Sequence, residues 1–383
     1  MKIPTPHLIV ALLASSGFCA EQPYPIVGTG QTRCYSDRGE IAPPKVGQPF
    51  FGQDAQHPGP APSYQDNGDG TVSDLNTGLT WVKARGQKTT WTNAIASVAA
   101  CRVGGHSDWR MPAIKELYSL INFTGGCHGT VANSTPYLDI RYFEFVYGDE
   151  STGVRIIDCQ DWSATQYRGR TMSGNPTVFG VNFADGRIKG YPKSFPNGRT
   201  AQMYSRYVRG NLAYGKNDFH ENGDGTVTDR ATGLMWQQSD SGKAVDWQGA
   251  LAYAEGLTLA GHDDWRLPNA KELQSIVDYT RSPATTGTAA IDPAFKVTQV
   301  ESWCWTSTSH FDGPPDIAGR AAVYVCFGRA WGYMWGQWLD VHGAGAQRSD
   351  PMSGNPADYG YARGPQGDQI RILNYVRCLR DGT

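Results

Sequence analysis

The sequence lacks the features that usually mark membrane, nucleic-acid-binding and metal-binding proteins. No long hydrophobic run follows residue 20, so we expect no membrane-spanning segment in the rest of the chain. The 34 basic and 36 acidic residues are interleaved, and no basic stripe suggests a nucleic-acid partner. No Cys-x-x-Cys pair occurs, which argues against a zinc site. The sequence therefore predicts no metal, no other cofactor, no nucleic acid and no membrane span.

The first twenty residues have the order of a secretory signal peptide. Lys2 is followed by an apolar run at 8–14 and by small residues at 15–17. The apolar run is too short to cross a bilayer. We therefore expect 1–20 to be removed and the remaining chain to be exported, either to the periplasm or to the cell surface and the extracellular space.

Removal of that segment leaves an odd number of cysteines. In an exported protein, cysteines form disulfides more often than they bind metals. At most three bonds can form, and the spacing alone does not choose the pairs. The cysteines are Cys34, Cys101, Cys127, Cys159, Cys304, Cys326 and Cys378.

The chain contains one long motif twice. Gly-His-x-Asp-Trp-Arg-x-Pro-x-x-Lys-Glu-Leu occurs at 105–117 and again at 261–273. We therefore divide the chain into a glycine- and proline-rich leader at 21–63 and two copies of one domain at 64–211 and 212–383. Four further motifs recur in the same order: Asn-Gly-Asp-Gly-Thr-Val at 67–72 and 222–227, Thr-Gly-Leu-x-Trp at 77–81 and 232–236, Trp-(Ser/Thr)-x-Thr at 162–165 and 305–308, and Tyr-Val-Arg at 207–209 and 375–377.

Each copy is expected to contain strands, two helices, a long loop and further strands. Asn-Gly and Asp-Gly supply the positive φ angles of tight turns, so the first motif of each copy predicts a hairpin. Thr90 and Asp246 are the expected caps of the first helices. Apolar residues at spacings of three and four predict the helices themselves: Trp91, Ala94, Ile95 and Val98, then Ile114, Leu117, Leu120 and Ile121, in the first copy, and Trp247, Ala250, Leu251 and Ala254, then Ala270, Leu273, Ile276 and Val277, in the second.

The leader contains too many helix breakers to be helical. Its aromatic residues Tyr35, Phe50 and Phe51 favour a segment docked on the first domain. A flexible linker is the alternative interpretation.

The ordered motifs resemble the Lcl C-terminal domain family, which is named for the C-terminal domain of a bacterial collagen-like adhesin. The resemblance covers nearly all of both copies. It implies an α+β fold made of two tandem C-type-lectin-like domains, each with two helices packed on a small, twisted, mostly antiparallel sheet. The adhesin domain binds sulfated glycans, so the resemblance implies a glycan or an extracellular protein as the partner. Most members of the family have no assigned activity.

The cysteines depart from the pattern of this family. The family often has a cysteine in the first helix and another after the terminal Tyr-Val-Arg, whereas here Cys101 and Cys378 occur in different copies. No cysteine of one copy has a cysteine counterpart in the other. We therefore expect a tryptophan-rich core to stabilise the fold, with a disulfide from Cys34 or Cys101 to Cys378 as a working hypothesis.

The repeated histidine and aspartate of the long motif suggest catalysis or metal binding at first sight. His106 precedes Asp108, and His262 precedes Asp264. A metal site needs three or four ligands, and neither loop offers more than two. We therefore interpret both loops as structural anchors, with Asp108 and Arg110 as an ion pair and the tryptophan buried. The anchor residues are Asp108, Trp109, Arg110, Asp264, Trp265 and Arg266.

Two further interpretations are disfavoured. The Asp-Gly turns lack the terminal bidentate glutamate of a calcium loop, and the sugar-binding triplets of calcium-dependent lectins are absent. Formylglycine-generating enzymes, which share the lectin-like architecture, need two cysteines close together in sequence. Cys326 and Cys378 are far apart in this chain. An envelope enzyme that uses the His-Asp loops or such a cysteine site remains the alternative function.

The aromatic residues differ most between the copies. Four tryptophan pairs match and are expected in the core, whereas Trp303, Trp331, Trp335 and Trp338 occur only in the second copy. Aromatic side chains between glycines can stack on sugar rings or contact a protein. The alternative is a loop that covers an open sheet edge. The sequence thus predicts a non-catalytic binding or adhesion module whose candidate ligand-binding residues are Arg329, Trp331, Tyr333, Trp335 and Trp338.

Overall fold

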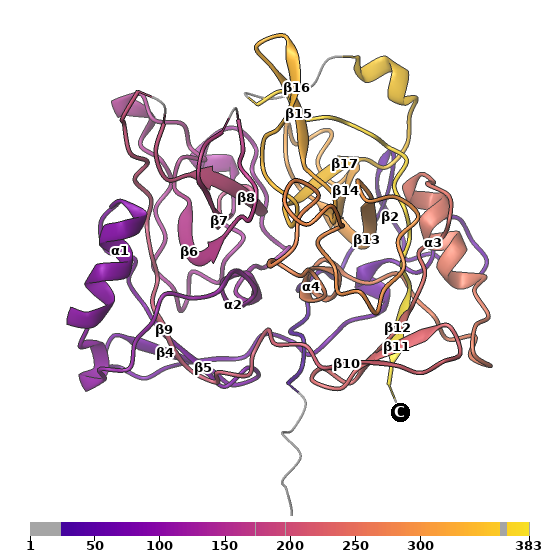
Figure 1. Ribbon diagram of the computed structural model, residues 1–383, viewed down its shortest axis with the longest axis horizontal. Helices are drawn as coiled ribbons and strands as arrows, with labels where there is room; N and C mark the ends of the chain where they lie inside the picture. Colours follow the sequence, from indigo (N-terminus) through magenta and orange to yellow (C-terminus); the bar gives the residue numbers. More distant parts are fainter. Residues whose placement is uncertain (1–23, 173, 196, 361–365, 383) are drawn as a thin grey trace, which may run out of the picture.

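The computed structural model describes residues 24–172, 174–195, 197–360 and 366–382. The expected signal peptide at 1–20 lies outside these residues. Figure 1 shows the two copies side by side, with the first in indigo to magenta and the second in orange to yellow. We call 24–63 the leader, 64–211 the first half and 212–383 the second half. In the described ranges, no helix is long and apolar enough to cross a membrane.

The structure is mostly β, so the expected α+β fold of two C-type-lectin-like domains is wrong. Helices form at the predicted apolar stripes, but each has only six to nine residues. The first ends in a 3-10 turn and the third ends at Gly256, in a chain with 46 glycines and 23 prolines. Such short helices depend on tertiary packing for their stability. They are α1 (Trp91–Ser97), α2 (Ile114–Ser119), α3 (Trp247–Glu255) and α4 (Ala270–Ser275).

Each half contains a four-stranded antiparallel sheet built from the repeated hairpin motif and the strand that closes the half. In the first half the order is β3 (Tyr64–Asp66), β4 (Thr71–Asp74), β5 (Leu79–Val82) and β9 (Val208–Gly210). In the second half it is β10 (Phe219–Glu221), β11 (Thr226–Asp229), β12 (Leu234–Gln237) and β18 (Leu379–Asp381).

The remaining long strands of both halves form one six-stranded sheet. The halves join where Ile188 pairs with Gln347. Its order is β13 (Trp303–His310), β14 (Ala321–Cys326), β17 (Gln347–Pro351), β8 (Arg187–Pro192), β7 (Thr177–Asn182) and β6 (Asp161–Gln166). The two joining strands, β8 and β17, occupy equivalent positions in their halves. Lys189 of β8 pairs with Gly180 of β7, and in the same way Arg348 of β17 pairs with Tyr324 of β14. A separate hairpin consists of β15 (Trp331–Met334) and β16 (Gln337–Asp340).

Helices α2 and α4 meet at the same junction through reciprocal hydrogen bonds. Lys115 Nζ donates to the Ser275 carbonyl at 2.6 Å, and Lys271 Nζ donates to the Ser119 carbonyl at 2.8 Å. Since the lysines and the serines occupy the same positions of the repeat, this contact has the isologous geometry of a two-fold dimer. One hydrophobic cluster contains buried residues of both halves, including Trp81 and Trp236. The halves therefore share a core.

Seven of the eight repeated tryptophans are buried, as predicted, and Trp91 is partly exposed. The terminal Tyr-Val-Arg motifs, however, are not structurally equivalent. Arg206 and Arg377 make the same bonds, since each guanidinium donates to carbonyls at the end of β5 or β12. The structurally equivalent segments are therefore Arg-x-x-Arg at 206–209 and 377–380. This alignment of the two copies is shifted by three residues from the one that Tyr-Val-Arg suggests.

The leader is docked, but mainly on the second half rather than on the first as expected. Its short strands are β1 (Cys34–Ser36) and β2 (Gly39–Ile41), followed by the 3-10 turn η1 (Asp54–Gln56). The Tyr35 ring lies 4.8 Å from that of Phe311, and Phe50 lies 6.1 Å from Trp247. The aromatic residues that predicted docking thus complete the apolar cluster of the second half.

All seven described cysteines are free thiols, so the expected disulfides, including a bond to Cys378, are wrong. Six are buried, and Cys326 and Cys378 belong to the tryptophan-rich cluster of the second half. These cysteines act as small apolar side chains. Burial raises the pKa of the Cys159 and Cys304 thiols to about 12, which keeps them protonated and unreactive.

Thiol titration without reductant tests this description of the cysteines. In denaturant, we expect seven reactive thiols in the chain that begins after residue 20. In the native protein, Cys101 should react first, because it is the one thiol among the described residues that is not buried. Fewer thiols in denaturant would show a disulfide and contradict the structure.

Candidate functional site

The β15–β16 hairpin carries the residues that the sequence marks as ligand-binding, and it projects from the molecule at the top of Figure 1. Its two-residue turn consists of Trp335 and Gly336, with φ angles of 53° and 81°. Positive φ at both positions is typical of a type I′ turn. A bulky residue in this conformation costs on the order of 1 kcal/mol. Even so, the side chain gains little burial, because Trp335 is 69% exposed.

Three more aromatic residues share one face of the hairpin. Tyr333 lies opposite Trp338, and Trp331 lies opposite Asp340. Because side chains alternate along a strand, these aromatic residues point to the same side. The rings of Tyr333 and Trp338 are 5.4 Å apart, and Trp338 is 41% exposed.

Arg329 completes this group. Its guanidinium lies 4.2 Å from the centre of the Trp331 ring and pairs with Glu301. The five predicted ligand-binding residues therefore lie on one hairpin and the segment just before it, in two contacting pairs with Trp335 at the turn. The hairpin pairs with the segment at 366–369 rather than with the six-stranded sheet, whose edges are β6 and β13. The alternative of a loop that covers an open sheet edge stays a prediction, since Trp331 packs against the buried cluster that contains Trp303 and Tyr324.

A cavity of about 510 Å³ lies beside the hairpin. Trp338 and two tyrosines, Tyr359 and Tyr375, supply aromatic surface, while Glu301 and Arg371 supply charge. The Arg371 guanidinium lies 3.7 Å from the centre of the Trp303 ring and donates to the Glu301 carbonyl at 2.7 Å. The polar groups are thus held in fixed positions, as a ligand site requires.

The ion pairs of the anchor loops differ from the expectation. Asp108 does not pair with Arg110: it accepts from Arg209 at 2.7 Å, and Asp264 likewise accepts from Arg380 at 2.7 Å. Arg110 pairs instead with Glu116 on α2, and the same pair, Arg266 with Glu272, recurs on α4. Trp109 and Trp265 are 4% and 2% exposed.

These ion pairs bear on the histidines as well. Asp108 and Asp264 are committed to arginines, so neither carboxylate orients the neighbouring histidine as a general base would require. Within the described part of the chain, no three His, Cys, Asp or Glu side chains lie close enough to hold a metal ion. The turn aspartates bond within their own turns: Asp69 accepts from Thr71, and Asp224 from Thr226.

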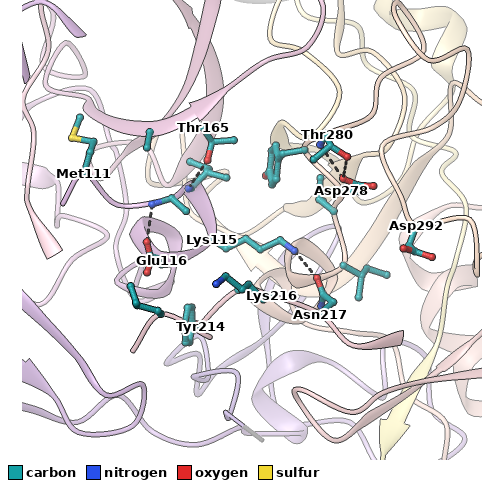
Figure 2. Close-up of a pocket in the computed structure, with 18 of the residues that line it drawn as sticks. Met111, Lys115, Glu116, Thr165, Tyr214, Lys216, Asn217, Asp278, Thr280 and Asp292 are labelled. Carbon is teal, nitrogen blue, oxygen red and sulfur yellow. Dashed lines mark hydrogen bonds between the residues drawn. The ribbon is translucent and has the colours of Figure 1, made fainter. Parts of the chain in front are cut away.

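A larger cleft, of about 600 Å³, lies between the halves and is drawn in Figure 2. The start of α2, the connection around Asn217 and the residues after α4 line it. Lys115 Nζ donates to Asn217 Oδ1 at 2.7 Å, and burial lowers the pKa of this lysine to about 8. Thr165 Oγ1 accepts from the Ile114 amide at 3.0 Å. Sequence reasoning missed this cleft because its walls come from three distant segments.

The equivalent place in the second half is filled by the leader. There the buried Asp54 carboxylate accepts from Thr308 and, at 2.7 Å, from Thr29. Burial raises the pKa of Asp54 to about 6, although both hydroxyls oppose this shift.

Together these features define a tandem-repeat protein in which two copies of one mostly β module are joined across a pseudo-two-fold junction. Residues 70–209 and 225–336 match the family model of the Lcl C-terminal domain, so the chain belongs to this family. The second match ends in the hairpin turn, which lies in a part of the second copy that the first lacks. No curated protein and no solved structure matches the chain.

Exchange of Asp54 for asparagine tests the buried carboxylate. Because its pKa in the folded protein is above the ordinary value, the folded state binds this proton more tightly than the unfolded state. The contribution of Asp54 to the free energy of unfolding should therefore fall as pH rises from about 4 to 6, by about 2 kcal/mol. Asp54→Asn should flatten this fall in urea titrations, whereas Glu40→Gln, at an exposed leader carboxylate, should not. An unchanged pH profile in Asp54→Asn would contradict this assignment.

Proposed function

We propose that the chain is an exported, non-catalytic binding module that holds a glycan or a protein of the cell exterior through the β15–β16 hairpin. The observation that carries this proposal is the exposed Trp335 in a left-handed turn conformation. A tryptophan at that position is unfavourable for folding and contributes little to the core. Such local costs are typical of residues that serve binding.

The chemistry around the turn supports a glycan in particular. Trp335 and Trp338 offer flat apolar faces on which the C–H groups of a sugar ring can stack. The adjoining cavity offers donors and acceptors for hydroxyl groups, on Gln299, Glu301 and Gln369. Family membership supports a domain of the extracellular or adhesion type.

An enzymatic function for the His-Asp loops has no such support. The loops have the same ion pairs in both halves, and these pairs fix the ends of β9 and β18. Their repetition follows from the fold.

Alanine variants of the hairpin tryptophans test the proposal. Trp335→Ala and Trp338→Ala should each weaken binding of a ligand found on a glycan array by 10-fold or more, as expected for aromatic hot spots. Because both side chains are exposed, the melting temperature should change little, as it should in the control Leu212→Ala, at an exposed residue outside the hairpin. Variants that melt several degrees lower, together with an array that yields no ligand, would show that the hairpin is structural.

A further inference from the structure

The leader makes a defined set of hydrogen bonds where it crosses the junction between the halves. The Phe123 amide donates to the Thr29 carbonyl at 2.8 Å, and Lys271 Nζ donates to the Gly28 carbonyl at 3.1 Å. Asp54, 25 residues after Thr29, accepts from the Thr308 hydroxyl and from Thr29 itself. Two separate segments of the leader, at 28–29 and at the 3-10 turn that begins with Asp54, thus fill this groove and supply one buried carboxylate.

The cleft of Figure 2 is the pseudo-symmetric twin of that groove. Thr165 is equivalent to Thr308, because each accepts from the first amide of the helix in its own half, α2 or α4, at 3.0 and 2.9 Å. Tyr279 is equivalent to Phe123, because each follows a residue, Asp278 or Asn122, whose side chain caps the same turn. Both Thr165 and Tyr279 line the cleft.

In the part of the chain that the structure describes, no leader-like segment fills this twin groove. Residues 24–63 pack mainly on the second half, and the connection between the halves contributes Asn217, which accepts from Lys115 Nζ. Among the described residues, the Thr165 hydroxyl and the Tyr279 amide have no acceptor, whereas their twins bond to Asp54 and Thr29. The cleft therefore presents donors in the arrangement that holds the leader.

We propose that this cleft binds an acidic peptide segment of a partner protein. A main-chain carbonyl of the peptide accepts from the Tyr279 amide, and an aspartate or glutamate accepts from the Thr165 hydroxyl. Lys115 and Lys216 line the cleft, and so do Glu116, Asp278 and Asp292, all labelled in Figure 2. The Thr165 hydroxyl, rather than a net positive charge, therefore selects the carboxylate. The volume of about 600 Å³ is within the range of ligand sites.

Because the leader is buried in its own molecule, a partner protein is favoured as the occupant of the cleft over the leader of a second copy. Thr29 and Asp54 are both buried in their own molecule. A second copy could fill the cleft with its leader only after breaking those contacts and exposing the apolar cluster that Tyr35 and Phe50 complete. This exchange would be a domain swap with a large cost in free energy.

A peptide that copies the leader tests the proposal in the full-length protein. The probe is residues 49–57, Pro-Phe-Phe-Gly-Gln-Asp-Ala-Gln-His, with blocked ends. We expect saturable one-to-one binding by calorimetry, and chemical-shift changes at the cleft. The same peptide with Asp54→Asn should bind at least 10-fold more weakly. Trp335→Ala should leave this binding unchanged, which separates it from the hairpin.

Protein variants locate the binding site. Thr165→Val should weaken peptide binding at least 10-fold, whereas Thr165→Ser, which keeps the hydroxyl, should restore it. Thr130→Val, at an exposed threonine that does not line the cleft, is the matched control. No binding at millimolar peptide, or equal binding of both peptides, would overturn the proposal. Self-association that Thr165→Val abolishes would identify a second copy as the occupant and would also overturn it.

Discussion

The structure depends on the reciprocal contact of two lysines, the half-buried Lys115 and the buried Lys271, with the last turn of the opposite helix. Each ammonium donates to a carbonyl of the other half, so each half satisfies backbone groups that the other leaves open. Lys271 is 3% exposed, and this burial lowers its pKa to about 7. The contact therefore holds only while the halves stay packed together, and it couples their folding.

This junction explains why one repeated sequence produces two different surfaces. The pairing of β8 with β17 places equivalent strands at the centre of one sheet. Additions to the repeat then break the symmetry. The leader fills one groove and leaves its twin open, and the β15–β16 hairpin extends the second half alone. The shared residues build the core, and the unmatched ones create the surfaces available for binding.

The sequence predicted what depends on local pattern: the repeat, the hairpin turns, the positions of four helices and the burial of most repeated tryptophans. It did not predict the features that depend on contacts between residues far apart in the sequence. A single cross-strand pair, Ile188 with Gln347, merges sheets that each copy was expected to hold separately. We expected the leader to dock on the nearer half, because its aromatic residues indicate that it is buried but do not indicate which half it packs against. The terminal Tyr-Val-Arg match was misleading, since the structurally equivalent residues are Arg206 and Arg377, and the Arg-x-x-Arg pattern that they begin is shorter than the chance match beside it.

The central claim is that the two halves form one folding unit with a common core. Urea unfolding of the full chain, followed in parallel by tryptophan fluorescence and far-ultraviolet circular dichroism, tests it most directly. The structure predicts one transition with coincident midpoints and a calorimetric enthalpy equal to the van't Hoff enthalpy. Two separated transitions, one for each half, would contradict it.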